Sequence, residues 1–289
     1  MKKIAVLPSL LTLGNAFCGF LAVAKVGDAA LAYRAGEEAL FTGNLQTAVL
    51  LIFLAMVFDA LDGKVARLTN QTTDFGAQLD SLSDAVTFGV APAFLGKVLL
   101  ETEGIKVMPF LAKHPRFIFL ITAVYALFAV MRLARFNVES QGHEEEFQGR
   151  FKGLPTPAAG GFIAALVLFW INRTDSTNVV LSNLPDWVFD TALGILPWGL
   201  LAAGAAMVSP VPYAHLVNFL FKRRKSFPFL AGLVSAIGFV AISYEAALFF
   251  FTLVYLVSGP VLGGIDHLRK GAGRGGGGRL LEGPRSASG

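Results

Sequence analysis

Long apolar runs separated by short polar segments fill most of this chain. A helix that crosses a bilayer needs about 20 apolar residues. Runs that approach or reach this length lie at about 15–33, 45–66, 80–100, 116–136, 156–172, 188–208, 227–243 and 245–264. The last two are short and are joined by "SYEA", which favours a tight helical hairpin. The pattern therefore predicts an all-α membrane bundle of about eight transmembrane helices.

The two ends of the chain depart from this pattern. Before the first span, "KKIAVLPSLLTLGN" is typical of a short amphipathic helix that lies on the membrane surface. The final segment, "RKGAGRGGGGRLLEGPRSASG", is basic and rich in glycine, so we expect it to be disordered. The predicted organisation is a surface helix at 1–14, a transmembrane core at 15–213, a transmembrane hairpin at 214–268 and a tail at 269–289.

Composition supports the membrane interpretation. Of the 289 residues, 54% are hydrophobic and 15% are charged, whereas a soluble domain carries about a quarter charged residues. The single cysteine, Cys18, excludes an internal disulfide and a thiolate metal cluster. The net charge of +4 comes from basic residues in the predicted loops, which fits contact with an anionic leaflet better than a nucleic-acid groove.

The distribution of basic residues predicts an orientation, because cytoplasmic loops carry an excess of Lys and Arg. With the N-terminus in the cytoplasm, 17 of the 24 Lys and Arg fall on the cytoplasmic side. We therefore expect both termini to be cytoplasmic. The same orientation places the most acidic stretch of the chain at the cytoplasmic end of the second and third spans.

That stretch, "DALDGKVARLTNQTTDFGAQLDSLSD" at 59–84, has a helical spacing of its acids. Asp59 and Asp62 share one helix face, and Asp80 and Asp84 share a face of the next helix. The polar turn between the helices makes them antiparallel neighbours, so the four carboxylates can face one another. Asp74 is out of phase, and we expect it to be the N-cap of the third span.

Four neighbouring carboxylates repel one another unless cations compensate them. Hard oxygen ligands select Mg²⁺, Mn²⁺ or Ca²⁺, and the stretch has no His or Cys that would favour zinc. Two such ions a few ångströms apart suit phosphoryl transfer. Small residues at Gly63, Ala66 and Gly76 would leave room for a ligand, or would allow close helix packing. Arg67 would bind a phosphate or form a structural salt bridge.

The acidic stretch carries the motif Asp-x2-Asp-Gly-x2-Ala-Arg-x8-Gly-x3-Asp-x3-Asp at residues 59–84. In this respect the chain resembles the CDP-alcohol phosphotransferases, whose members transfer a phosphoalcohol group from a CDP-linked donor to an alcohol and release CMP. The resemblance implies Asp59, Asp62, Asp80 and Asp84 as metal ligands for Mg²⁺ or Mn²⁺, two per site. It implies Asp84 also as the general base. It implies that the CDP donor contacts Gly63, Ala66, Arg67 and Gly76.

Further stretches narrow the resemblance. "LPSLLTLGNAFCGFLA", "QLDSLSDAVTFGVAPA", "RLARFN", "FKGLPTPAAGG" and "MVSPVPY", between residues 7 and 213, resemble bacterial membrane-integral phosphatidylserine synthases. Ser9 departs from the usual Asn of the family, but Thr12 and Asn15 remain as implied donor contacts. The implied substrates are CDP-diacylglycerol and L-serine, and the implied setting is a homodimer in the bacterial inner membrane, with its active site on the cytoplasmic side.

A serine pocket needs a cation for the carboxylate and acceptors for the ammonium. Arg132 and Arg135 close the fourth span, with Asn137 and Lys152 nearby. One arginine would hold the carboxylate through a bidentate contact, and anchoring of a helix end is the alternative. Ser83 would tune the pocket or bond within its helix.

Two other functions compete with serine transfer. The same family signature serves other acceptors, and glycerol 3-phosphate or an inositol phosphate would call for more basic residues in the pocket. A cation transporter would also place acids in membrane helices. Transporters, however, usually bind ions near the midplane between repeats, and this chain has its acids at the end of two spans and no visible repeat.

Overall fold

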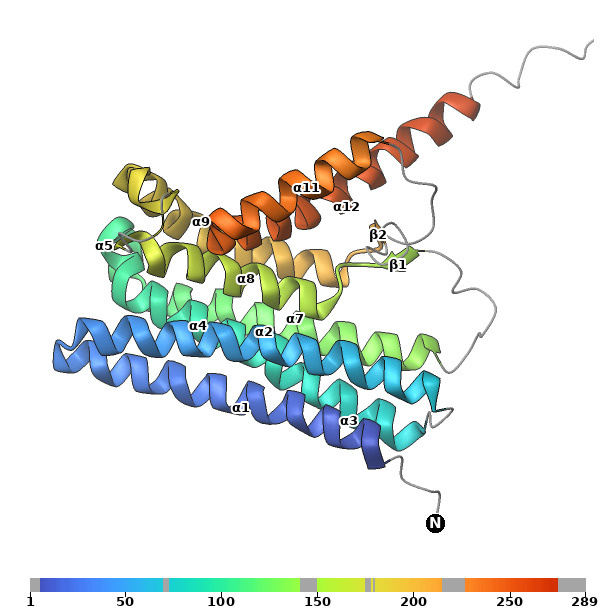
Figure 1. The fold of residues 1–289 in the computed structure, drawn as a ribbon, viewed down its shortest axis with the longest axis horizontal. Coiled ribbons are helices and arrows are strands. Elements are labelled where there is room, and N and C mark those ends of the chain that lie inside the picture. Colours follow the sequence, from blue (N-terminus) through green and yellow to red (C-terminus); the bar gives the residue numbers. More distant parts are fainter. Residues whose placement is uncertain are drawn as a thin grey trace, which may run out of the picture.

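A computed structural model describes residues 6–69, 73–140, 150–174, 178, 180–214 and 227–274. These residues form a bundle of helices whose long axes run roughly along one direction (Figure 1). One pair of three-residue strands joins them, β1 (Arg150–Lys152) and β2 (Pro212–Ala214), paired antiparallel with Phe151 opposite Tyr213. The predicted all-α bundle is confirmed, since the two short strands only pair one loop segment with another.

The helices follow the chain in a simple order. Their bounds are α1 (Val6–Ala35), α2 (Glu38–Leu68), α3 (Asp74–Asp84), the π-helical η1 (Ala85–Val90), α4 (Ala91–Leu99), the π-helical η2 (Leu100–Gly104), α5 (Ile105–Val107), α6 (Pro109–Lys113), α7 (Pro115–Ser140), α8 (Thr156–Ile171), the 3₁₀ turns η3 (Asn172–Thr174) and η4 (Leu181–Asn183), α9 (Asp186–Val208), α11 (Phe227–Ile242) and α12 (Tyr244–Arg274).

Each of the eight predicted apolar runs lies in a helical segment. Among the described residues, six segments are long and apolar enough to cross a membrane: α1, α2, α3 to α5, α7, α9 and α12. The other two, α8 and α11, have 16 residues each. At about 1.5 Å per residue they would extend about 24 Å, less than the roughly 30 Å of a hydrocarbon core.

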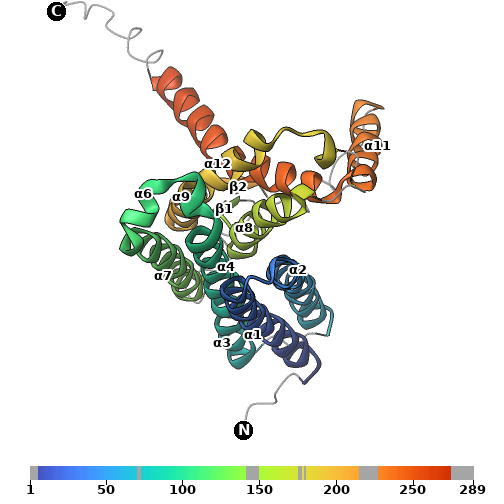
Figure 2. The same ribbon diagram turned by 90° about the vertical axis from the view of Figure 1, so that its left-hand side faces the viewer.

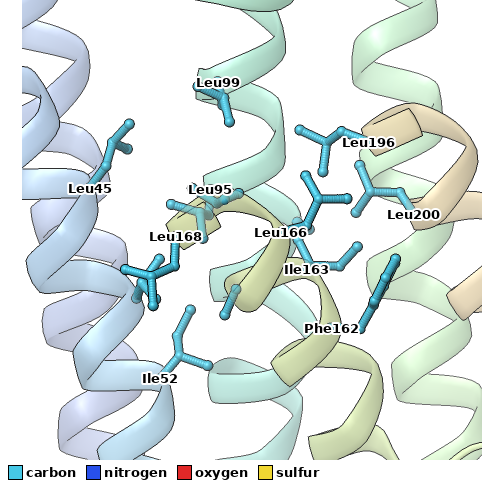
Figure 3. Packing of buried hydrophobic residues seen from close by; sticks show 14 of the residues in the cluster. Leu45, Ile52, Leu95, Leu99, Phe162, Ile163, Leu166, Leu168, Leu196 and Leu200 are labelled. Carbon is cyan, nitrogen blue, oxygen red and sulfur yellow. The ribbon is translucent and has the colours of Figure 1, made fainter. Parts of the chain in front are cut away.

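The short helix α8 lies at the centre of the bundle. From Ala159 to Ile171 all of its residues are buried, which is the pattern of a helix that is apolar on all sides because protein surrounds it. Figure 3 shows its Phe162, Ile163 and Leu166 side chains among leucines of α4 and α9, with α2 on the other side. This core holds together the helices that carry the acidic stretch and those that face it.

The first two helices form an antiparallel hairpin, side by side in Figures 1 and 2. α1 ends at Ala35 and is followed by Gly36, which has a φ of +78°, a conformation that glycine adopts without a Cβ penalty. The backbone N–H groups of Gly36 and Glu37 close the turn by donating to carbonyls of Tyr33 and Ala32, at 3.1 and 3.0 Å. This turn sends α2 back along α1, so that the acidic end of α2 lies beside the start of α1.

The structure differs from the predicted boundaries at both ends. Residues 6–14 are the first turns of a continuous α1 and not a separate surface helix; Pro8 stands where a proline is tolerated in a helix start. α12 continues to Arg274, past the predicted start of the tail at 269, because adding residues to a formed helix costs less than nucleating one. Residues 1–5 and 275–289 lie outside the described part of the chain.

One end of the bundle gathers the polar elements. The start of α3, the last turns of α7 and the β1–β2 pair lie together at the right of Figure 1, opposite the α1–α2 turn. The acidic stretch, the "RLARFN" segment and the strand that carries Lys152 therefore meet at the same end, as the sequence-based interpretation requires.

Candidate functional site

The centre of this end is a group of three carboxylates. Asp59 and Asp62 come from the last turns of α2 and Asp80 from α3, and each offers an oxygen within 4.8 Å of the others. Asp62 is 5% exposed. Asp62 Oδ2 and Asp80 Oδ1 are buried and have no hydrogen-bond partner among the described residues. Buried carboxylate oxygens are normally satisfied, so these two indicate a place for a ligand that bonds to oxygen.

These residues fit a divalent cation. Three carboxylates with unpartnered oxygens supply hard ligands and negative charge, which Mg²⁺ and Mn²⁺ prefer. The predicted metal group is thus brought together for three of its four members.

The fourth acid, Asp84, has a different environment. It is 6% exposed at the end of α3, and its carboxylate interacts electrostatically with Asp59 and Asp80. Its Oδ1 accepts a hydrogen bond of 3.0 Å from Nδ2 of Asn15 on α1. Asp84 is therefore close to the group of three but is held by an amide, which suits a carboxylate that acts on substrate as well as on metal.

Hydrogen bonds to the backbone of α1 fix the helix that carries Asp84. The Ser83 hydroxyl donates to the Thr12 carbonyl at 3.1 Å, and the Thr87 hydroxyl donates to the Asn15 carbonyl at 3.2 Å. Thr87 also lies against Gly19, where a Cβ would overlap it. Ser83, predicted for the acceptor pocket, thus joins two helices. Thr12 and Asn15, predicted to contact the donor, lie beside Asp62 and Asp84 respectively.

The start of α3 corrects one prediction. The N-cap is Thr73, whose hydroxyl accepts a 3.0 Å hydrogen bond from the backbone N–H of Gly76. Asp74, predicted as the cap, is the first residue of the helix. Threonine and aspartate are both good caps, so spacing alone did not separate adjacent candidates. Asp74 is exposed and stands apart from the other acids, as expected.

The residues predicted for the donor line the last turn of α2 and the first turn of α3. A Cβ on Gly63 would meet only Arg67 Nη2, at 4.0 Å, so this face is open. Arg67 is exposed and donates from Nε to the Gly63 carbonyl at 3.0 Å. Ala66 and Gly76 are partly buried. Gly63 therefore leaves space beside the exposed guanidinium of Arg67, which is consistent with phosphate binding.

Arg132 of α7 reaches the acidic group from another side. Its guanidinium interacts electrostatically with Asp84 and Asp59, and Nη1 donates a short hydrogen bond to the hydroxyl of the fully buried Thr156, at the start of α8. This is the arginine of "RLARFN" that is positioned to act at the site. The sequence did not single out Thr156, since a threonine at a helix start is ordinary.

The other residues predicted for the acceptor lie at the same end of the bundle, and the side chains of Arg135 and Asn137 have structural partners. Arg135 donates from Nη1 to the Val208 carbonyl at 2.9 Å and lies 3.7 Å from Glu139. Asn137 accepts a 3.1 Å hydrogen bond from Ser81 of α3. Lys152 belongs to β1, where it pairs with Pro212. The residues predicted for the acceptor therefore come from segments at the same end of the bundle. Among them, Arg135 links α7 to α9.

Gly153 sets the position of this strand. Its φ is +87°, and a Cβ there would overlap the Met207 carbonyl. Its N–H donates to the Val211 carbonyl, and the next N–H, of Leu154, donates to Ala206, both at 2.9 Å. β1 is thus held tightly against the end of α9.

Together, the bundle and the site define a class: a multi-pass membrane protein with a carboxylate cluster suited to divalent metal at one end of two spans. The family model for CDP-alcohol phosphatidyltransferase matches residues 5–204. The chain belongs to this family, and the resemblance seen in the signature is confirmed.

Characterised relatives share this region. The CDP-diacylglycerol–serine O-phosphatidyltransferase of Bacillus subtilis is 35% identical over 155 residues, 53% of this chain and 71% of that protein. The protein of the same name from Methanocaldococcus jannaschii is 37% identical over 141 residues, 47% of this chain and 60% of that protein. Archaetidylserine synthase of Methanothermobacter thermautotrophicus is 34% identical over 165 residues, which are 56% of this chain and 58% of that protein.

Proposed function

We propose that this chain transfers the phosphatidyl group of CDP-diacylglycerol to the hydroxyl of L-serine and releases CMP. Relatives that are 31–37% identical carry serine-transferase names, and the family model covers the helices of the site. The observation that carries the proposal is the three-carboxylate group with two unpartnered oxygens, faced by Arg132. It combines a place for metal and phosphate with a cation suited to a carboxylate.

The reaction requires one bond exchange and one proton transfer. The serine hydroxyl oxygen forms a bond to the phosphorus that carries diacylglycerol, and the bond from that phosphorus to the oxygen of CMP breaks. The hydroxyl proton passes to Asp84, the proposed general base, and CMP leaves as the anion. A primary alcohol is a poor nucleophile near neutral pH, so a positioned carboxylate accelerates this step.

The remaining residues bind and orient the donor. Asp59, Asp62 and Asp80 would hold Mg²⁺ or Mn²⁺, with Asp84 contributing to a second ion; the ions would neutralise charge on the diphosphate. Arg67 would contact the phosphates beside the open face at Gly63. Asn15 would keep the Asp84 carboxylate directed at the acceptor hydroxyl.

The acceptor separates serine transfer from its nearest alternative. Serine presents a carboxylate to Arg132, whereas glycerol 3-phosphate or an inositol phosphate presents a phosphate that would call for further cations. Purified protein would be incubated with CDP-diacylglycerol, Mn²⁺ and each acceptor, and CMP would be measured. CMP release with serine supports the proposal; release only with a phosphorylated alcohol would replace serine, and release with none would remove the transferase assignment.

We extend the proposal to location and assembly. The basic residues favour a cytoplasmic active site in a bacterial inner membrane, and the family resemblance implies a homodimer. Labelling of single cysteines from each side of spheroplasts, in a background lacking Cys18, would test the orientation. Cross-linking in native membranes would test the dimer.

A further inference from the structure

Helix α12 reaches the acceptor side of the site from outside the matched family region, which ends at residue 204. Tyr213 of β2 binds α12 at this position, because the Tyr213 hydroxyl donates to the Leu256 carbonyl at 3.1 Å. Burial and the neighbouring Tyr255 raise the pKa of the Tyr213 phenol, so it stays a donor. A Cβ on Gly259 would overlap the Tyr213 ring. The absence of a side chain at 259 therefore lets α12 lie directly on β2.

This contact fixes the place of Tyr255, the residue before Leu256. Its ring centroid is 5.7 Å from that of Tyr213, with an interplanar angle of 50°. Tyr255 is partly buried, and it interacts electrostatically with Arg132. Arg132 in turn interacts with Asp84 and Asp59. A phenol from the C-terminal hairpin thus lies near Arg132, the arginine that interacts with Asp84 and Asp59.

The chemistry of this pair suits an amino-acid carboxylate. A guanidinium has five N–H donors. Among the described residues, Arg132 uses one of them in its hydrogen bond to the Thr156 hydroxyl. A carboxylate accepts several hydrogen bonds, and a neutral phenol adds a donor without adding charge. A phosphorylated acceptor would be served better by a second cation. The signature residues lie on α2 and α3 and are common to all acceptors, so selectivity has to arise from other elements.

We propose that Tyr255 is a specificity-determining residue, whose hydroxyl donates to the acceptor carboxylate that Arg132 binds. The inference rests on the proposed function, since it assumes that the acceptor is serine. It assigns a role in substrate choice to a helix beyond the matched family region.

The test compares Tyr255→Phe with the wild type in the CMP-release assay. Loss of one hydrogen bond to a charged group is worth about 1.5–3 kcal/mol, so the KM for serine should rise about tenfold or more. The KM for CDP-diacylglycerol should stay unchanged, because the ring remains and its packing against Tyr213 is kept. Tyr33→Phe is the matched control: Tyr33 donates to the Thr102 carbonyl far from the site, and both KM values should stay at wild type.

A second acceptor distinguishes contact from packing. Serinol replaces the serine carboxylate with a hydroxymethyl group, so Tyr255→Phe should change its reaction much less than that of serine. An equal change for both acceptors, or an unchanged KM for serine, would overturn the proposal. Tyr255→His retains a ring and an N–H donor and should recover part of the serine affinity; recovery of none would also count against it.

The two proposals fail separately. Wild-type protein that releases no CMP with serine refutes the proposed function, whatever the variants do. Wild-type protein that uses serine, together with a Tyr255→Phe variant of unchanged KM, leaves the function standing and refutes the role of Tyr255.

Discussion

Asn15 on α1 donates a 3.0 Å hydrogen bond from Nδ2 to Oδ1 of Asp84 on α3. Asn15 is fully buried, and its Oδ1 has no partner among the described residues. The amide is therefore placed with its donor toward the proposed general base. Without this hydrogen bond the Asp84 carboxylate would be freer to rotate.

Asn15→Ala should lower kcat about 10–100-fold, since the hydrogen bond to a charged group is worth about 1.5–3 kcal/mol. The KM for serine should change little, because the hydrogen bond from Asn15 goes to Asp84 and not to Arg132, the proposed carboxylate contact. Steady-state CMP release would measure both. Asn44→Ala is the control, because Asn44 is a part-buried amide at the other end of the bundle that accepts a 3.5 Å hydrogen bond from Lys25. Equal losses in both variants would show that the effect is not specific to Asp84.

Removal of the proposed base or of a ligand should abolish turnover. Asp84→Asn and Asp80→Asn should each reduce kcat by about 10²–10⁴-fold, the range for a lost general base. Asp74→Asn should retain most activity, because Asp74 is exposed in the first turn of α3 and outside the acidic group. Wild-type turnover by Asp84→Asn would refute its catalytic role.

Activity should depend on a divalent cation. A chelator should abolish CMP release, and Mg²⁺ or Mn²⁺ should restore it. Asp62→Asn should raise the Mn²⁺ concentration needed for half-maximal activity, since it removes one of three neighbouring carboxylates. Asp28→Asn, which affects only an exposed pair with Lys25, should leave the Mn²⁺ dependence unchanged. Full activity in the presence of chelator would contradict the metal site.

Gly153→Ala should damage the acceptor side of the molecule. A positive φ costs a residue with a side chain about 1–3 kcal/mol, and the added Cβ would overlap the Met207 carbonyl. The apparent melting temperature should fall and the KM for serine should rise. Gly194→Ala, on α9 with nothing within 4 Å of an added Cβ, should be neutral or stabilising.

A buried carboxylate far from the acidic group should matter for stability alone. Glu245, at the start of α12, is 2% exposed and accepts hydrogen bonds from Asn172 and Asn178, at 3.2 and 2.8 Å. Glu245→Ala would remove the acceptor of the Asn172 amide and one of two acceptors of the Asn178 amide, the other being Ser243 Oγ. Loss of a buried hydrogen-bond partner costs about 1–3 kcal/mol, so the melting temperature in detergent should fall. The exposed Glu38 provides the control: Glu38→Ala should melt like the wild type.

Sequence patterns were most informative where periodicity and a fixed spacing coincide. The apolar runs predicted the helices, and the i, i+3 and i+4 offsets of the acids, with the short turn between their helices, predicted that Asp59, Asp62 and Asp80 lie together. Both signals are local, because helix geometry alone determines which side chains share a face.

The rest depended on contacts between distant segments. The resemblance implied Asn15 as a donor contact, but nothing in the sequence indicated its hydrogen bond to Asp84. Nothing in the sequence around Thr156 or Tyr255 indicates that they lie at this end of the molecule, because each is brought there by packing of a different helix. The N-cap of α3 was missed by one residue, since Thr73 and Asp74 have similar capping propensity. Helix ends were misplaced at 14 and 269 because composition changes there without a change in backbone structure.

The burial of α8 has a consequence for how the protein responds to its membrane. A helix in contact with lipid must match the thickness of the hydrocarbon layer by tilting or by deforming the bilayer. α8 is surrounded by α2, α4, α9 and α12, so its 16 residues are released from hydrophobic matching. A change in bilayer thickness would therefore tilt or displace the outer helices. α8, whose first residue Thr156 bonds to Arg132, would keep its position relative to the site.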